Sequence, residues 1–211
     1  MGDPATERQR RFWDRAAPGY DRQMALLERI WFTGGREWIG ERATGRVLEV
    51  AIGTGLNLQH YSPEVTVTGV ELSAQMLARA RDRIARGTTP RRTTLLEGDA
   101  ERLPVADASY ETVVCGLSLC SIPDPARARA EMRRALVPGG HLILVDHVGS
   151  TWPPIYAAQW LLERVTIRVA GEHFTRRQRP RVEAAGFEVV EAERRRAGTI
   201  ERLRARRPAA G

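Results

Sequence analysis

The sequence predicts a doubly wound α/β fold, in which a seven-stranded sheet, mostly parallel with an antiparallel closing strand, carries helices on both faces. Two observations support this fold class. Short apolar runs of strand type alternate with segments of helical periodicity, an order that predicts parallel strands joined by crossover helices. Residues 141–147 form an almost continuous apolar run, which is typical of a strand buried on both faces.

The composition limits the classes of function. The 211 residues suit one domain with a substantial core, and 42% apolar and 28% charged residues are ordinary for a globular protein. All 33 basic residues are arginines, which excludes chemistry that depends on a lysine amine. The formal net charge of +7 could attract nucleic acid or anionic lipid. Because the arginines are spread along the chain, we interpret the charge mainly as a compositional preference.

The cysteines and the chain start give further expectations. Cys115 and Cys120 have a C-x₄-C spacing and no cluster of partner residues in the sequence. This pattern predicts neither a disulfide framework nor a zinc site, so we expect no metal and a reducing, cytoplasmic environment. The first residues lack the apolar core of a signal peptide, and no apolar run reaches about 18 residues, so no membrane-spanning segment is expected.

The N-terminal part of the chain reads as helical and then changes to strand. Helical periodicity marks the first forty residues, although Pro18-Gly19 is expected to interrupt it. Three of the five tryptophans lie there, which suggests a lid or a packing surface. Residues 46–51 then predict a buried strand that ends in a glycine turn, and a helix is expected to begin within residues 56–60.

The middle of the chain alternates regularly. Residues 65–71 predict the second strand, and Ser73 is a good N-cap for a helix over residues 74–86. The third and fourth strands are expected at residues 93–97 and 110–116.

The C-terminal part continues this alternation. Asp124-Pro125 predicts a helix start with proline in the first turn, and Pro138-Gly139-Gly140 ends that helix after residue 136. The strand at residues 141–147 follows. The remaining expected elements are helices at residues 154–169 and 176–185 and closing strands at residues 187–193 and 199–204.

Three features stand at the carboxyl ends of the first three strands, where ligands bind in open α/β sheets. The loop Gly53-Thr54-Gly55 allows a tight turn and a close approach of a ligand to the backbone. Glu71 ends the second strand and could accept hydrogen bonds from both hydroxyls of a ribose. Asp99 follows the third strand and is placed to bind the exocyclic amine of an adenine. Together the three features predict a site for an adenosine-containing ligand.

A nicotinamide dinucleotide is the main rival for the same scaffold. Its fingerprint, G-x-G-x-x-G/A, needs a third small residue beside the pyrophosphate, and Leu58 occupies that position here. Glu49, upstream of the glycines, could hold the loop or the amino group of a cationic ligand. A carboxylate there suits a cationic ligand better than a pyrophosphate.

Four segments carry a family resemblance: LEVAIGTG at residues 48–55, VTGVELSAQMLARAR at 67–81, EGDAERLPVADASYETVVC at 97–115 and EMRRALVPGGHLILVDH at 131–147. They resemble the motifs of the class I S-adenosylmethionine-dependent methyltransferases, which have a Rossmann-like fold. The first motif departs from the family at Ala51, where a glycine is usual, and we expect a slightly tighter loop there. The resemblance implies S-adenosylmethionine as the cofactor.

The resemblance also implies roles for individual residues. The cofactor-binding set comprises residues around the methionine moiety (Glu49, Gly53, Gly55 and Asn57), the ribose ligand Glu71, residues flanking the adenine (Leu72 and Met76), residues at the adenine edge (Asp99 and Ala100), the floor residue Leu117, and Tyr20, which resembles an aromatic residue that closes over the cofactor.

We expect a single methyltransferase domain over residues 1–205. Its parts are an N-terminal helical cap at 1–40, a cofactor-binding core at 45–148, substrate-cap helices at 150–186 and closing strands at 187–205; residues 206–211 are expected to form a disordered tail.

Catalysis should rest largely on positioning, because methyl transfer from a sulfonium is an in-line displacement. An amine or thiolate acceptor needs no elaborate base, whereas a phenol or a ring carbon must lose a proton. The candidate base is His147, which follows the fifth strand at the ligand-binding edge and has a suitable ordinary pKa. Asp146 and His173 are alternatives.

The acceptor is less well defined. The segment after the fourth strand resembles bacterial phosphatidylethanolamine N-methyltransferases and animal thiol S-methyltransferases, which predicts an amine or thiol on a small molecule or lipid. The opening FWDRAAPGYD resembles ubiquinone- and menaquinone-type enzymes, which favours C-methylation instead. A cofactor-binding protein without catalysis is a further alternative. The aromatic segment from Trp152 to Trp160 could cover the acceptor or lie on a membrane surface. We expect no nucleic-acid partner, and a monomer or homodimer.

Overall fold

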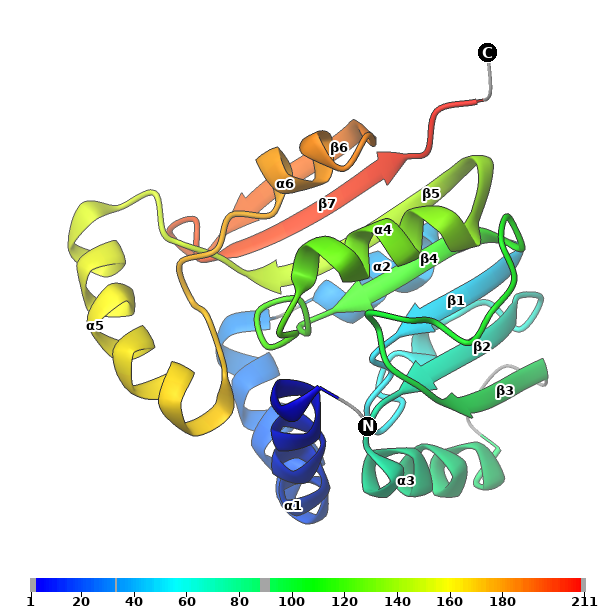
Figure 1. Ribbon diagram of the computed structural model, residues 1–211, viewed down its shortest axis with the longest axis horizontal. Coiled ribbons are helices and arrows are strands. Elements are labelled where there is room, and N and C mark those ends of the chain that lie inside the picture. Colours follow the sequence, from blue (N-terminus) through cyan, green and yellow to red (C-terminus); the bar gives the residue numbers. More distant parts are fainter. Residues whose placement is uncertain (1–2, 33, 88–91, 210–211) are drawn as a thin grey trace.

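The computed structural model describes residues 3–32, 34–87 and 92–209. Its seven strands form one sheet with the order β3-β2-β1-β4-β5-β7-β6 (Figure 1). The strands are β1 (Arg46–Val50), β2 (Thr66–Glu71), β3 (Arg92–Glu97), β4 (Tyr110–Gly116), β5 (Leu136–His147), β6 (Glu188–Arg195) and β7 (Ile200–Arg206). Neighbouring strands from β3 to β5 are parallel, and β7 is antiparallel to both of its neighbours.

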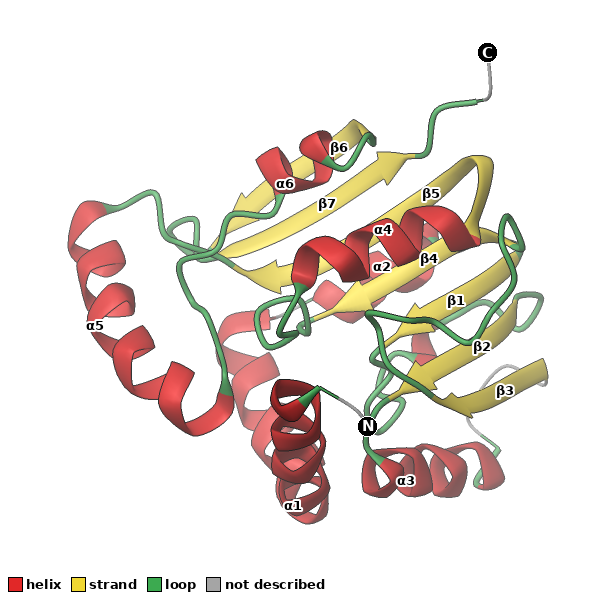
Figure 2. Ribbon diagram, in the orientation of Figure 1, coloured by secondary structure: helices red, strands yellow, loops and turns green. Residues whose placement is uncertain are grey.

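Helices cover both faces of the sheet, as Figure 2 shows. They are α1 (Pro4–Leu27), the π-helical segment η1 (Glu28–Phe32), α2 (Gly35–Arg42), the 3₁₀ turn η2 (Leu58–His60), α3 (Ala74–Ala85), α4 (Pro125–Ala135), α5 (Pro153–Ala170) and α6 (Arg179–Ala184). The doubly wound, mostly parallel fold with an antiparallel closing strand is therefore confirmed.

Each face of the sheet has its own apolar core. On one face, Ala128 and Met132 of α4 and Val182 of α6 pack on the sheet. On the other face, Ile39 of α2 and Leu77 of α3 pack on alternate strand residues. Because successive strand side chains point to opposite faces, the apolar central strands fill both cores at once.

The helix starts follow their capping residues. The Ser73 hydroxyl accepts a hydrogen bond from the Met76 backbone N–H at 3.1 Å. The Asp124 carboxylate accepts from Ala126 and Arg127, each at 3.0 Å, with Pro125 in the first turn. Both N-caps predicted from the sequence are therefore confirmed, and they fix the helices that follow β2 and β4.

Two local expectations at the N-terminal side were wrong. Pro18 does not interrupt the first helix, which runs continuously through it, because side chains on both sides of Pro18 bind the neighbouring loops and hold α1 in place. The helix expected after β1 is only the three-residue η2. Apart from this turn, residues 51–65 between β1 and β2 form a loop.

The C-terminal strands are longer than expected. β5 begins at Leu136, so Pro138-Gly139-Gly140 lies inside the strand, beside an irregularity in its pairing with β4. The tail is ordered further than expected, since Arg206 belongs to β7 and the Arg207 backbone N–H donates to Gly140 at 2.8 Å. Residues 210–211 of the expected tail lie outside the described residues.

No helix in the described part of the chain combines the length and the apolar character that a membrane span requires.

Candidate cofactor and acceptor site

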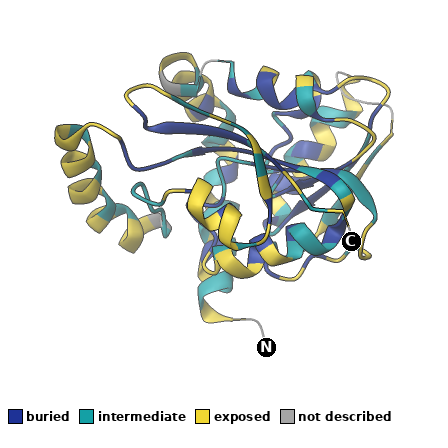
Figure 3. Cartoon of the chain, turned by 90° about the horizontal axis from the view of Figure 1, so that it is seen from above, coloured by how far each residue is buried: buried dark blue, intermediate teal, exposed yellow. Residues whose placement is uncertain are grey.

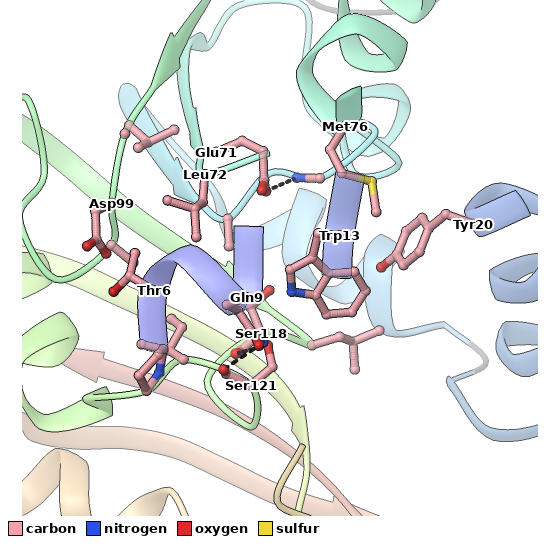
Figure 4. Close-up of a pocket in the computed structure, with 18 residues that line it drawn as sticks. Thr6, Gln9, Trp13, Tyr20, Glu71, Leu72, Met76, Asp99, Ser118 and Ser121 are labelled. Atoms are coloured by element: carbon pink, nitrogen blue, oxygen red, sulfur yellow. Dashed lines mark hydrogen bonds between the residues drawn. The ribbon is translucent and has the colours of Figure 1, made fainter. Parts of the chain in front are cut away.

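A pocket of about 680 Å³, open to solvent, lies at the carboxyl edge of the sheet beneath α1 (Figure 4). Its walls come from α1, from the loops after β1 to β4, and from the start of α3. The cofactor residues expected from the sequence that line it are Tyr20, Gly53, Glu71, Leu72, Met76, Asp99, Ala100 and Leu117. These residues are far apart in the sequence, and the fold brings them together around one cavity.

Glu71 is the most firmly held acid of this pocket. Its two carboxylate oxygens accept hydrogen bonds from the backbone N–H groups of Gly53 and Ser73, each at 2.9 Å. Burial raises the pKa of this carboxyl, while the N–H groups act in the opposite direction. The carboxylate thus has a fixed orientation and retains lone pairs on both oxygens for a further donor.

The floor of the pocket has a left-handed backbone at several points. Gly53 adopts φ +60°, and a Cβ built there would face open space, so the loop leaves room for a ligand. Ala51 and Leu117, which follow β1 and β4, both have φ +55°. This conformation is unfavourable for residues with a Cβ, and such strain is typical of functional sites. Ala51 thus keeps the backbone conformation of a glycine.

Gly55 does not line the pocket, but it shapes the loop. It has φ +77°, and an added Cβ would come within 2.8 Å of Leu58 Cδ1.

Asp99 lines the adenine side expected from the sequence, and its carboxylate accepts from the Glu101 backbone N–H at 2.9 Å.

A second, smaller hollow adjoins the first and shares Tyr20 and Gly53 with it. Glu49 and Asn57, both buried, line this hollow. The Glu49 carboxylate accepts from Asn57 Nδ2 at 2.7 Å and from the Tyr61 hydroxyl at 2.8 Å. Burial raises the pKa of Glu49 to about 7 against the opposing effect of these donors.

Arg36 of α2 is a functional candidate that the sequence reasoning missed. It lines the second hollow, donates from Nη1 to Asn57 Oδ1 at 2.6 Å, and forms an ion pair with Glu28. It is the only basic residue among the described residues that line either hollow. The acidic Glu49 and the cationic Arg36 therefore flank the same space, and Asn57 is hydrogen-bonded to both side chains.

Helix α1 forms the roof, and its pocket residues were also missed except for Tyr20. Figure 4 shows Thr6, Gln9, Trp13 and Tyr20 along the side of α1 that faces the cavity. The rings of Trp13 and Tyr20 meet edge to face at 6.0 Å. The spacing of these four residues matches one side of a helix, a signal that was present in the sequence. Burial raises the pKa of Tyr20 to about 12.

Polar contacts fasten α1 to the loops below it. Ser73 Oγ donates to Asp14 at 2.6 Å, and Gln9 Nε2 donates to the Ser121 carbonyl at 2.8 Å. Asp21 accepts from the Thr54 hydroxyl at 2.6 Å and from Arg83 at 2.7 Å. The roof is therefore bonded to the glycine loop, to the start of α3 and to the loop after β4.

The expected base His147 lies away from the lining of both hollows. Its ring stacks on Phe174 with centroids 4.5 Å apart, and burial lowers its pKa to about 4. A group with that pKa accepts a proton weakly at neutral pH. The two alternative bases, Asp146 and His173, are engaged in other contacts. Asp146 accepts a hydrogen bond from Gln178 Nε2 at 3.2 Å, and Nδ1 of His173 lies 3.1 Å from Oε1 of Glu163.

Comparison with known proteins agrees with the fold. Residues 48–144 match the family described as "Methyltransferase domain". The match covers less than half of the chain, from β1 into β5, and the seven-stranded sheet with an acidic pocket at its carboxyl edge agrees with a likeness to the S-adenosylmethionine-dependent methyltransferases. S-adenosylmethionine is the cofactor of that class, and the open space at Gly53 and the carboxylate of Glu71 fit its adenosine part.

Three relatives represent the subgroups that the sequence resembles. Phosphatidylethanolamine N-methyltransferase of Cereibacter sphaeroides is 38% identical over 57% of this chain and 59% of its own length. Ubiquinone/menaquinone biosynthesis C-methyltransferase UbiE of Paracoccus denitrificans is 30% identical over 74% of this chain and 64% of its own. Human thiol S-methyltransferase TMT1A is 33% identical over 63% of this chain and 56% of its own length. The chain thus spans less than two thirds of these relatives.

A solved structure matches the fold over nearly the full chain. The S-adenosylmethionine-dependent methyltransferase of Thermotoga maritima, described as a possible histamine N-methyltransferase, has a TM-score of 0.69 and 22% identity, with 93% of this chain and 99% of that chain covered.

Proposed function

We propose that this protein transfers the methyl group of S-adenosylmethionine to an amine nitrogen of a small molecule or lipid. The observation that carries the proposal is the convergence of Glu49, Glu71 and Asp99 on adjoining hollows under α1. Bound there, the cofactor would supply the methyl group of its positively charged sulfonium for in-line transfer to the acceptor, with the sulfur as the leaving group. The chain's own residues bind and orient the cofactor and the acceptor, and they exclude water from the site.

The adenosine end fits the larger hollow. Glu71 accepts from the ribose hydroxyls through lone pairs that Gly53 and Ser73 leave free. Asp99 accepts from the exocyclic amine of the adenine, between the side chains of Leu72 and Met76. Tyr20 and Trp13 close over the ligand from α1.

The methionine end fits the smaller hollow, and its two charges find partners there. Its ammonium group faces Glu49, whose negative charge requires the loss of a proton held with a pKa of about 7. Its carboxylate faces Arg36, which exchanges part of its contact with Glu28 for the ligand. The Asn57 amide keeps both side chains oriented.

The acceptor side favours nitrogen or sulfur over a ring carbon. A third, small hollow, lined by Phe32, Leu117, Val145 and Glu28 among others, adjoins the methionine end through Arg36 and Asn57. No histidine lines any of the three hollows within the described part of the chain. A carbon acceptor would need such a base. Glu28 instead suits an amine, because a carboxylate attracts the cationic form of an amine.

Helix α5 supports a lipid-borne acceptor. None of its described side chains is buried, and its large apolar residues include Leu161, Val165 and Val169, which are 63, 58 and 68% exposed. Its polar residues Gln159 and Glu163 point back and bond to the adjoining segments. Arg164 and Arg168 lie on the same helix. An apolar helix face with flanking arginines is suited to the surface of an anionic bilayer.

A methyl-transfer assay with radiolabelled cofactor tests the acceptor. The full-length protein is offered phosphatidylethanolamine vesicles, an alkyl thiol and a demethylated quinone precursor. We expect the largest transfer to the phospholipid amine. Transfer to the quinone precursor alone would overturn the amine assignment and leave the methyltransferase class intact, whereas absence of cofactor binding by calorimetry would overturn both.

A vesicle sedimentation assay tests α5. The double variant Leu161→Asn/Val165→Asn should lose binding to anionic vesicles, while Val190→Asn, which changes an equally exposed apolar residue of β6, should bind like the unaltered protein. Equal binding of all three proteins would show that α5 does not contact the bilayer. Loss of a dimer in sedimentation velocity, with vesicle binding unchanged, would assign the helix to a second copy of the chain.

A further inference from the structure

A buried polar cluster lies outside the proposed site, where β5 ends beside the loop after β4. It consists of Cys120, Asp146 and His147. Each offers one atom that can bind a metal ion, and these three atoms all lie within 4.8 Å of one another. Cys120 and Asp146 are each only 1% exposed. None of the three lines the hollows of the cofactor site.

One side chain of this cluster and one neighbour of it have incomplete hydrogen bonding. Nδ1 of His147 is buried and has no hydrogen-bond partner among the described residues. Gln178, which donates to Asp146, likewise leaves its buried Oε1 without one. Because buried polar atoms are nearly always bonded, each of these two atoms is available to a further partner. An imidazole nitrogen is also a common metal ligand.

The donor set indicates which cation. A thiolate and an imidazole together select a borderline-soft ion, and a carboxylate is a common third ligand of zinc. Bonds of about 2.0–2.3 Å to zinc place tetrahedral ligand atoms roughly 3.3–3.8 Å apart. The three atoms lie within 4.8 Å of one another, so side-chain rotations that bring them about 1 Å closer complete the geometry. Three protein ligands leave a fourth position for water or another ligand.

We propose that Cys120, Asp146 and His147 bind one Zn²⁺ ion. In the metal-free state the Cys120 thiol donates its hydrogen to the Asp146 carboxylate. Binding breaks the S–H bond, forms the Zn–S bond and releases the proton to solvent, so no oxidant or reductant is needed.

The surroundings hold the ligands in position. Oδ1 of Asp146 accepts from the His147 backbone N–H at 2.9 Å, Oδ2 accepts from Gln178 Nε2, and Phe174 stacks on the His147 ring. Such contacts orient metal ligands in proteins. Cys120 belongs to the loop that also carries Ser118 and Ser121 to the cofactor pocket. The ion would therefore anchor that loop to the end of β5.

Cobalt substitution tests the site with a readout that does not depend on methyl transfer. The full-length protein is freed of metal with a chelator and titrated with Co²⁺. We expect a thiolate-to-cobalt charge-transfer band that saturates at one equivalent and disappears when Zn²⁺ is added. The band should be absent in Cys120→Ser and present in Cys115→Ser, since Cys115 is equally buried in β4 and has no place in the cluster.

Thermal unfolding provides the second measurement and guards against a variant that does not fold. Zn²⁺ should raise the unfolding midpoint of the unaltered protein and of Cys115→Ser, because a ligand that binds the native state stabilises it. His147→Gln, checked for folding by circular dichroism, should not respond. A missing charge-transfer band, or an equal band in Cys120→Ser, would overturn the proposal.

Discussion

The two long helices outside the α/β core, α1 and α5, are used in opposite ways. α1 lies along the carboxyl edge of the sheet beside α3, whereas α5 stands at the side of the molecule, and its side chains are largely exposed (Figures 1 and 3). In α1, Ala17 is 1% exposed and polar side chains bind three separate loops. In α5, the hydrogen bonds of Gln159 and Glu163 reach only the chain segments that adjoin the helix.

This difference separates the two parts of the proposed reaction. The contacts of α1 cover the pocket that we propose for the cofactor, so the fold itself specifies that half of the site. The apolar surface of α5 is left uncovered by the fold, and large exposed apolar patches are typical of interaction sites. Substitutions on the α1 side should therefore change cofactor affinity, and substitutions on α5 should leave it unchanged.

The largest effect on cofactor affinity is expected at Glu71, which lines the pocket beneath α1. Glu71→Ala should weaken S-adenosylmethionine binding about 100-fold, because hydrogen bonds to a charged group contribute about 1.5–3 kcal/mol each. Isothermal titration calorimetry measures the change. Leu161→Asn of α5 is the matched control and should bind the cofactor normally. An affinity loss in Leu161→Asn, or none in Glu71→Ala, would contradict the separate roles assigned to α1 and α5.

Arg36 should have a smaller effect that depends on the ligand. Arg36→Gln is expected to weaken S-adenosylmethionine binding about tenfold, since it removes one charge-assisted pair with the ligand carboxylate. Binding of 5′-methylthioadenosine, which has no amino-acid part, should be unchanged. Parallel calorimetric titrations of both ligands make the comparison. Equal weakening for the two ligands would assign Arg36 to the structure of the hollow rather than to the carboxylate.

The attachment of α1 can be loosened at Asp21, which joins it to Thr54 and Arg83. Asp21→Asn removes the charge that pairs with Arg83 and should weaken cofactor binding several-fold. Hydrogen exchange should become faster in α1 and stay the same in α5. If exchange in α1 does not change, contacts at Asp14 and Gln9 are sufficient to hold the roof.

The smallest effect is a pH dependence at Glu49. Its pKa is raised from 4.5 to about 7, so the folded chain keeps a proton there that the unfolded chain has lost. Stability from this group is therefore full below about pH 4.5 and decreases as the pH rises through 7. The ligand's ammonium favours the ionised form, so cofactor affinity should increase a few-fold from pH 6 to 8. Glu49→Gln should flatten both profiles, measured by calorimetry and thermal unfolding; unchanged profiles would contradict this account.

The central sheet and the outline of the pocket were predictable because their signals are local. Apolar runs of strand length, the caps at Ser73 and Asp124, and the acids at the carboxyl ends of β1 to β3 each lie within one element or directly beside it. Since parallel strands bring their carboxyl ends to one edge, those acids had to converge. The same reasoning placed Glu71 and Asp99 in the pocket, but it gave no means to judge the depth at which His147 is buried.

The sequence by itself determined the fold class and predicted a ligand site at the carboxyl edge of the sheet, with some of the residues that line the hollows there. Only the tertiary structure decided that α1 closes over the pocket, that Arg36 reaches Asn57, that Cys120 meets Asp146 and His147, and that α5 remains uncovered. The physical reason is that periodicity and capping act between residues a few positions apart. Which surfaces meet, and which stay exposed, depends on packing between elements that are distant in the chain.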